Sequence, residues 1–256
     1  MSDIVATTDD VMIVNAARAL GELAAAGHSV CFVGIGLPST AANLARRLYD
    51  PPPILVYESG CIGSKPTRLP LSIGDGELGE TSDAVVSVPE IFSYWLQAGR
   101  IDLGFLGGAQ FDRFGNINST VIGSYDAPRT RLPGAGGAPE IAASAGQVMV
   151  IMRQSRRAFV ERCDFRSSFG FGEGKGDRER LGLRGAGPQV VITDLGVLRP
   201  DPDSCEFVMA ALHPGVTRDR CREETGWPLN FVAALVETDA PTERELVTLR
   251  ALQAAA

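Results

Sequence analysis

The 256-residue sequence predicts an α/β fold with helices packed on parallel strands. Two observations support this class. The N-terminal quarter of the chain alternates in the order helix, strand, helix, strand, and further apolar runs of strand length follow among helical segments. Strands joined by a helical crossover run parallel. Hydrophobic residues make up 45 % of the chain and charged residues 21 %, a balance that buries a sizeable core.

The first four elements have clear local signals. A helix cap and an acidic first turn at residues 8–10 start the first helix. Three prolines at 51–53 close the second helix, because each proline ring removes a backbone donor. The expected elements are a helix from residue 8 to Gly27, a strand over 29–33, a helix over 40–49 and a strand over 54–57.

The rest of the chain is expected to mix loops with shorter elements. Residues 64–88 lack helical periodicity and are predicted as a long loop with short strands, and residues 110–138 as mostly loop. Residues 166–187 are rich in Gly, Arg and Glu and predict an exposed or partner-facing loop. Helices are expected from Pro89, from Pro139, over 218–225 and over 242–252, and strands over 101–106, 148–152, 190–193 and 207–212. With no repeat and no long linker, residues 1–256 are predicted to form a single domain.

Composition excludes several classes of function. The net charge of −7, with scattered Lys and Arg, argues against nucleic-acid binding. Five cysteines without a CxxC pair and two distant histidines predict no metal site. The N-terminus lacks a basic signal region, and no apolar run approaches the ~20 residues of a membrane span. The protein is therefore expected to be cytoplasmic, with reduced thiols and no membrane partner.

Glu58 is the main candidate for chemistry. It follows the apolar strand at 54–57 and precedes a Gly turn. Ligands of α/β sheets bind outside the carboxyl ends of strands. A carboxylate partly shielded from water there acts as a base or a covalent nucleophile. The alternative is a strand-end residue in a surface ion pair.

Glycine turns provide the second signal. Residues 34–36, 107–108 and 136–137 lie just after an apolar strand or before a helix. Glycine lets the backbone approach a ligand closely, and a helix N-terminus favours anions, so a phosphorylated or thioester ligand fits. Tight βα turns are the simpler alternative. Glu58 lies 22 residues after Gly36, which keeps a nicotinamide-binding interpretation open, although Ser39 replaces the third glycine of that fingerprint.

Eight strings of residues occur in order along nearly the whole chain: VGIGLP (33–38), VYESG (56–60), GGAQFD (107–112), GNINST (115–120), RTR (129–131), GAGGA (134–138), RERLGL (178–183) and GPQVVITD (187–194). Together they resemble the β subunits of class I CoA-transferases, most closely the glutaconate CoA-transferase group. The resemblance implies the fold of that superfamily, with a central, mostly parallel sheet flanked by helices.

The resemblance also implies a site and a partner. Glu58 falls on the catalytic glutamate of the family, and coenzyme A is a co-substrate with no tightly bound cofactor. A homologous α subunit completes the site, and several heterodimers assemble together. The positions that fall on loops contacting CoA or lining the same cleft are Gly34, Ile35, Gly36, Leu37, Pro38, Gly107, Gly108, Ala109, Gly136 and Gly137.

The implied reaction moves CoA between an acyl-CoA and a small carboxylic acid through a glutamyl-CoA thioester on Glu58, by ping-pong chemistry. A CoA-ester hydrolase or lyase on the same scaffold is the alternative.

Other side chains are assigned smaller roles. Cys61 is expected to pack, and His213 to sit in a turn. Arg129 and Arg131 are candidates to hold a substrate carboxylate. The cations of the 166–187 loop are candidates for CoA phosphates or a partner surface, with simple solvation as the alternative: Lys175, Arg178 and Arg180.

Overall fold

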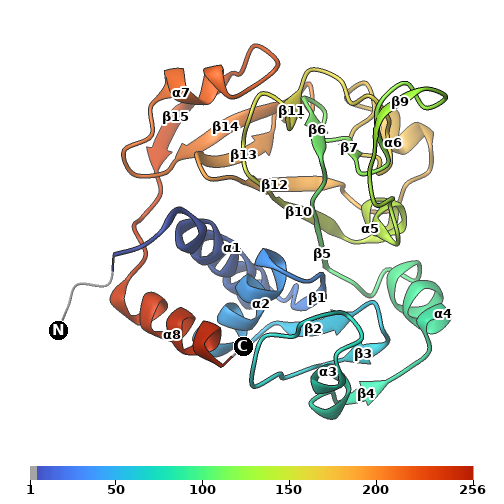
Figure 1. Cartoon of the computed structure of the whole chain (residues 1–256), viewed down its shortest axis with the longest axis vertical. Coiled ribbons are helices and arrows are strands. Elements are labelled where there is room, and N and C mark those ends of the chain that lie inside the picture. Colours follow the sequence, from blue (N-terminus) through green and yellow to red (C-terminus); the bar gives the residue numbers. More distant parts are fainter. Residues whose placement is uncertain (1–4, 256) are drawn as a thin grey trace. The chain divides into compact units, whose positions relative to one another are not determined.

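A computed structural model describes residues 5–255, which form two compact units (Figure 1). Unit 1 contains residues 5–105 and 240–255, and unit 2 contains residues 106–239. No helix among the described residues is long and apolar enough to cross a membrane. The prediction of a single domain over residues 1–256 stays a prediction.

The sheet of unit 1 has a parallel centre. Its strands, in spatial order, are β5 (Leu103–Leu106), β1 (Val30–Val33), β2 (Ile54–Tyr57), β3 (Cys61–Ile62) and β4 (Ala84–Val85). β1 pairs in parallel with both β2 and β5, as the helical crossover between β1 and β2 predicted. β3 and β4 add antiparallel strands at one edge. The carboxyl ends of β1, β2 and β5 therefore meet at the same edge.

Three long helices pack together in unit 1: α1 (Thr8–Ala25), α2 (Leu37–Leu48) and α8 (Glu243–Ala254) (Figure 1). α2 begins at residue 37 rather than 40, because Gly36 caps it with a φ of 82° and Pro38 suits the first turn. The 64–88 loop contains a short helix that the sequence did not predict, α3 (Gly76–Glu80). The helix expected at Pro89 is α4 (Val88–Glu90), continued by the π-helix η1 (Ile91–Leu96).

The main strands of unit 2, in spatial order, are β10 (Gln147–Ile151), β12 (Pro188–Ile192), β13 (Gly196–Pro200), β14 (Phe207–Leu212) and β15 (Phe231–Glu237). β10 pairs in parallel with β12, and β14 with β15, whereas β13 runs antiparallel to both neighbours. The helices are α5 (Ala138–Ser144), α6 (Asp177–Arg180) and α7 (Arg218–Glu223). The predicted α/β class, a central sheet flanked by helices, is confirmed.

Residues 110–138 are mostly loop, as predicted, but short strands interrupt the loop. Four short strands lie there: β6 (Gln110–Asp112), β7 (Ile117–Asn118), β8 (Val121–Gly123) and β9 (Pro128–Arg131). The strand β11 (Phe159–Val160) pairs with β6. Aromatic contacts hold this region. The Phe111 ring lies 5.4 Å from Phe159 and 5.0 Å from Phe207, and Phe159 stacks on Trp227. Strands of two to four residues show too little periodicity to be predicted from the sequence.

Candidate active site

Glu58 lies in a turn directly after β2, and its side chain is half-buried. The Gly60 amide donates to the Tyr57 carbonyl at 2.9 Å and closes this turn. Within residues 5–255, the Glu58 carboxylate has no hydrogen-bond or ion-pair partner in the structure. The alternative of a surface ion pair therefore finds no support in the described part of this chain.

Glycine is required at position 60. Its φ is 104°, and a Cβ there would lie 1.9 Å from the Val86 carbonyl oxygen. The Val86 amide donates to the Gly60 carbonyl at 3.0 Å, so the turn packs against the strand-edge segment beside β4. The backbone that carries Glu58 is thus held on both sides, while its carboxylate makes no hydrogen bond to the described residues.

The 34–38 loop lies beside Glu58. In the parallel β1–β2 register, Val33 pairs with Tyr57, so Gly34 and Glu58 follow neighbouring positions on strands about 4.8 Å apart. A Cβ at Gly34 or Gly36 would meet no atom within 4 Å. The first turn of α2 contains no acidic residue. Open space and a helix N-terminus suit a negatively charged group such as a phosphate.

Unit 2 brings the other two predicted glycine loops together through one short segment. The Ala109 amide donates to the Asn118 carbonyl at 2.9 Å, and the Gly134 amide donates to the Ser119 carbonyl at 2.9 Å. Gly108 is packed tightly, since a Cβ there would lie 2.4 Å from Ile117 Cγ2. The loops at 107–109 and 134–137 therefore flank residues 118 and 119.

These two loops differ in how open they are. Gly107 is exposed at the end of β5. Gly136 is exposed with a φ of 51°, and a Cβ there would meet nothing within 4 Å. Gly137 is the N-cap residue of α5. The prediction that these loops line a cleft for a ligand stays a prediction.

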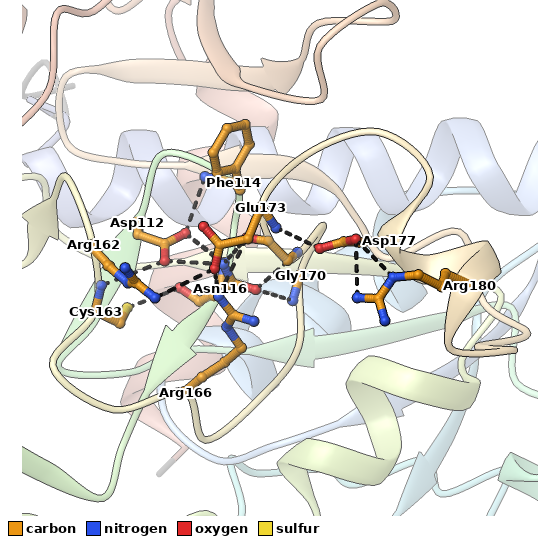
Figure 2. A network of polar contacts seen from close by, with 11 residues as sticks. Asp112, Phe114, Asn116, Arg162, Cys163, Arg166, Gly170, Glu173, Asp177 and Arg180 are labelled. Atoms are coloured by element: carbon orange, nitrogen blue, oxygen red, sulfur yellow. Dashed lines mark hydrogen bonds and ion pairs between the residues drawn. The ribbon is translucent and has the colours of Figure 1, made fainter.

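A buried polar network in unit 2 was not predicted as part of the site (Figure 2). Asp112 accepts hydrogen bonds from the amides of Phe114 at 3.1 Å and Asn116 at 3.0 Å, and from the Asn116 side chain. Asn116 Oδ1 in turn accepts from the amides of Gly170 at 3.0 Å and Gly172 at 3.2 Å. Burial raises the pKa of Asp112 although these hydrogen bonds oppose the shift. The sequence signal for this network is the run Asp-Arg-Phe-Gly-Asn at 112–116, which is typical of a turn.

Arg178 is buried, whereas the sequence predicted a role at the surface. Only 5 % of it is exposed, and it donates to the carbonyls of Gly185 at 2.7 Å, Gly170 at 2.9 Å and Ala142 at 3.0 Å. Burial lowers the pKa of its guanidinium. Because its donors are used inside the protein, the predicted contact with phosphates or a partner is wrong for this residue.

The two neighbouring cations stay at the surface. Lys175 donates to the Pro202 carbonyl at 3.0 Å, and Arg180 donates to Asp177 at 3.1 Å in the ion pair drawn in Figure 2. Their predicted roles toward phosphates or a partner stay predictions.

The remaining candidates fall into two groups. Cys61 is buried, as expected of a packing residue, and His213 lies in a turn after β14, where its Nε2 is 2.9 Å from the Thr193 carbonyl oxygen. Arg131 stacks on Tyr125, with 4.8 Å between the guanidinium carbon and the ring centroid, whereas Arg129 is exposed. Among residues 5–255, no group of three or more His, Cys, Asp or Glu side chains is placed to hold a metal ion.

Comparison with protein families decides the class of this chain. The family model described as coenzyme A transferase matches residues 15–224. The chain belongs to the coenzyme A transferase family. The predicted resemblance and the predicted enzyme class are both confirmed.

Three relatives show how this coenzyme A transferase family member compares with known proteins. The B subunit of the 3-oxoadipate CoA-transferase of Pseudomonas knackmussii is 59 % identical over 248 residues, which cover 97 % of this chain and 94 % of the relative. The B subunit of the glutaconate CoA-transferase of Acidaminococcus fermentans is 38 % identical over 227 residues, 86 % of this chain and 84 % of the relative. The cholesterol ring-cleaving hydrolase IpdB subunit of Mycobacterium tuberculosis is 27 % identical over 225 residues, 84 % and 83 % of the two chains.

The fold agrees with that of a solved member of this coenzyme A transferase family. The crystal structure of glutaconate coenzyme A-transferase from Acidaminococcus fermentans superimposes with a TM-score of 0.88 and 33 % identity. The match covers 96 % of this chain and 94 % of the solved chain. The predicted superfamily fold is therefore confirmed.

Proposed function

We propose that this chain is the β-type subunit of a heteromeric acyl-CoA:carboxylate CoA-transferase, with Glu58 as its covalent nucleophile. The single observation that carries the proposal is the unpaired, half-buried carboxylate of Glu58 beside the open 34–38 loop. Two relatives are themselves named as one subunit of a CoA-transferase, which supports a second, homologous subunit as partner.

The reaction transfers CoA in two symmetrical halves. A Glu58 carboxylate oxygen attacks the thioester carbonyl of an acyl-CoA, the C–S bond breaks, and a mixed anhydride and the CoA thiolate form. The thiolate then attacks the Glu58 carbonyl carbon and releases the first acid as its carboxylate, which leaves a glutamyl-CoA thioester. An incoming carboxylate reverses both steps, departs as the new acyl-CoA and restores Glu58. No net proton is taken up or released, and one hard step is divided into easier ones.

The glycine loops are proposed to bind CoA and to stabilise the negative charge that develops in the reaction. The 34–38 loop and the N-terminus of α2 bind the negatively charged part of CoA. Backbone amides of glycine loops, in this chain or in the partner, are proposed to donate to the oxyanions of the tetrahedral intermediates. The partner is expected to exclude water, because a glutamyl thioester exposed to solvent would hydrolyse.

The acid is proposed to be a dicarboxylate, with 3-oxoadipate as the first substrate to test. The support is the 59 % identity, over nearly the full length of both chains, to the B subunit of a 3-oxoadipate CoA-transferase. Arg129, which is exposed on β9, stays a predicted contact for a substrate carboxylate.

The test uses the complex produced with its partner chain. Succinyl-CoA is added without an acceptor acid, and borohydride then reduces the trapped thioester to an alcohol that mass spectrometry locates on a peptide. The Glu58 peptide should carry the modification, and Glu58→Gln should lower kcat by about 10³-fold or more. Glu22→Gln, which changes an exposed carboxylate on α1, is the matched control and should keep full activity. Turnover with an unmodified Glu58 peptide would sink the proposal.

A hydrolase or lyase is the second candidate, and the similarity to the cholesterol ring-cleaving hydrolase favours it. Release of free CoA without any acceptor acid, as fast as transfer, would support it over the transferase. The nicotinamide-binding interpretation rests on spacing alone. CoA esters should raise the melting temperature of the complex while NAD leaves it unchanged.

A further inference from the structure

A buried phenol lies immediately before the proposed nucleophile. Tyr57 ends β2 and is fully buried. Its hydroxyl oxygen lies 3.2 Å from Asn43 Nδ2, which donates to it, and 3.4 Å from Ser39 Oγ. Burial raises the pKa of Tyr57, so the phenol is neutral and keeps its own proton to donate.

Both partners of Tyr57 belong to α2, the helix that follows the 34–38 loop. Ser39 is the third residue of this helix, and Asn43 Nδ2 also donates to the Ser39 carbonyl at 2.9 Å. Ser39 and Asn43 are themselves buried. The three side chains therefore join the residue before Glu58 to the first turns of the helix that begins at the proposed CoA loop.

This polar cluster is costly for the fold. Asn43 Oδ1 is buried and has no hydrogen-bond partner in the structure. A buried acceptor left unpaired costs about 1–3 kcal/mol, and apolar residues of the same shape would avoid that loss. Features that break packing rules in this way cluster at functional sites.

Further contacts around Glu58 restrain its backbone. The β1–β2 register and the Gly60 turn fix the main chain of residues 57–60. Neither joins this turn to α2. Among residues 5–255, the side-chain hydrogen bonds that join residue 57 to the helix are those of the Tyr57 hydroxyl.

We propose that Tyr57 and Asn43 are positioning residues, which set the Glu58 carboxylate relative to the N-terminus of α2. The proposal rests on the proposed function, because it concerns the geometry between nucleophile and bound acyl-CoA. A displacement of about 1 Å in such a geometry lowers the rate about 10²-fold. Binding of CoA itself depends on the open glycine loop and is retained.

The test follows formation of the Glu58 adduct in single turnovers of the complete complex with succinyl-CoA. Tyr57→Phe should slow the adduct by roughly 10- to 100-fold and leave KM for succinyl-CoA nearly unchanged. Tyr49→Phe removes a hydroxyl from the C-cap residue of α2 and is the matched control, with an unchanged rate. A second variant, Tyr57→Phe with Asn43→Leu, replaces the polar pair by apolar groups. It should unfold at or above the wild-type temperature yet remain slow.

The outcomes separate the two proposals. No adduct in the wild-type complex would overturn the proposed function and this inference with it. An adduct that forms in the wild type and equally fast in Tyr57→Phe would overturn the inference alone. A double variant that regains both wild-type stability and wild-type rate would also overturn it, since the cluster would then serve only folding.

Discussion

Arg18 on α1 and Glu245 on α8 form a two-bond ion pair, although 227 residues separate them in the sequence. Arg18 Nε donates to Glu245 Oε1 at 2.7 Å, and Arg18 Nη2 donates to Oε2 at 2.7 Å. Glu245 also accepts from the amide and hydroxyl of Thr242, which makes it the acidic partner in the capping box of α8. One carboxylate thus caps its own helix and binds the neighbouring one.

A second ion pair has the same arrangement with the roles of α1 and α8 exchanged. Asp10 is the acidic partner in the capping box that Thr7 forms at the start of α1, and it accepts two hydrogen bonds from Arg250 on α8. Each helix therefore supplies an arginine to the capping carboxylate of the other. This reciprocal contact attaches the C-terminal helix of the chain to unit 1.

The ion pair should contribute measurably to stability. Glu245→Gln keeps an amide that can still cap α8 but removes the charge that Arg18 binds. The free energy of unfolding should fall by about 1–2 kcal/mol, between the values for exposed and buried pairs. Denaturant titration measures the change. Glu243→Gln alters an exposed acid in the same helical turn and should have little effect; equal losses in both variants would contradict a specific role for the pair.

Acid should weaken this contact in a defined range. Burial raises the pKa of Glu245 and of Asp10, but the bonds to Arg18, Arg250 and the capping threonines outweigh it, so both pKa values lie below the ordinary 4.5 and 3.8. The unfolded chain therefore binds these protons first. The stabilisation is complete above about pH 5 and disappears as the pH falls through the lowered pKa values. The stability difference between wild type and Glu245→Gln/Asp10→Asn should shrink from pH 6 toward pH 3; a constant difference would contradict the mechanism.

Gly60→Ala should harm both stability and catalysis. The new Cβ would lie 1.9 Å from the Val86 carbonyl oxygen in a residue with φ of 104°, so the turn that carries Glu58 has to move. Gly27→Ala is the matched control, because Gly27 also has positive φ but its Cβ would meet nothing within 4 Å. We expect loss of most Glu58 adduct formation only for Gly60→Ala. Equal adduct rates in both variants would show that the turn tolerates the shift.

Arg178→Met should destabilise the chain strongly. The guanidinium satisfies the carbonyls of Gly185, Gly170 and Ala142, which would be left without these donors. Such losses cost about 3 kcal/mol or more. Arg180→Met, two residues away and exposed, should change the free energy of unfolding by less than about 0.5 kcal/mol. Thermal unfolding measures the stability of the two variants. A small effect of Arg178→Met would contradict a structural role for this arginine.

Part of the candidate site could be predicted from local signals. Apolar runs located β1 and β2, and the prolines at 51–53 located the end of α2, because each signal acts within a few residues. The place of Glu58 at a strand end followed from them. The sequence could not show that Asn118 and Ser119 bind the loops at 107–109 and 134–137, since those hydrogen bonds join separate segments.

By itself, the sequence determined the α/β class, the β1–α2–β2 crossover and the presence of a carboxylate beside glycine turns. These features depend on patterns among residues that are close together in the sequence. Only the tertiary structure decided that Arg178 lies inside the protein, that Tyr57 reaches α2 and that α8 pairs with α1. Each of these features depends on hydrogen bonds between groups that lie far apart in the sequence. Buried polar groups in a folded protein need such partners, so the tertiary structure decides which groups pair.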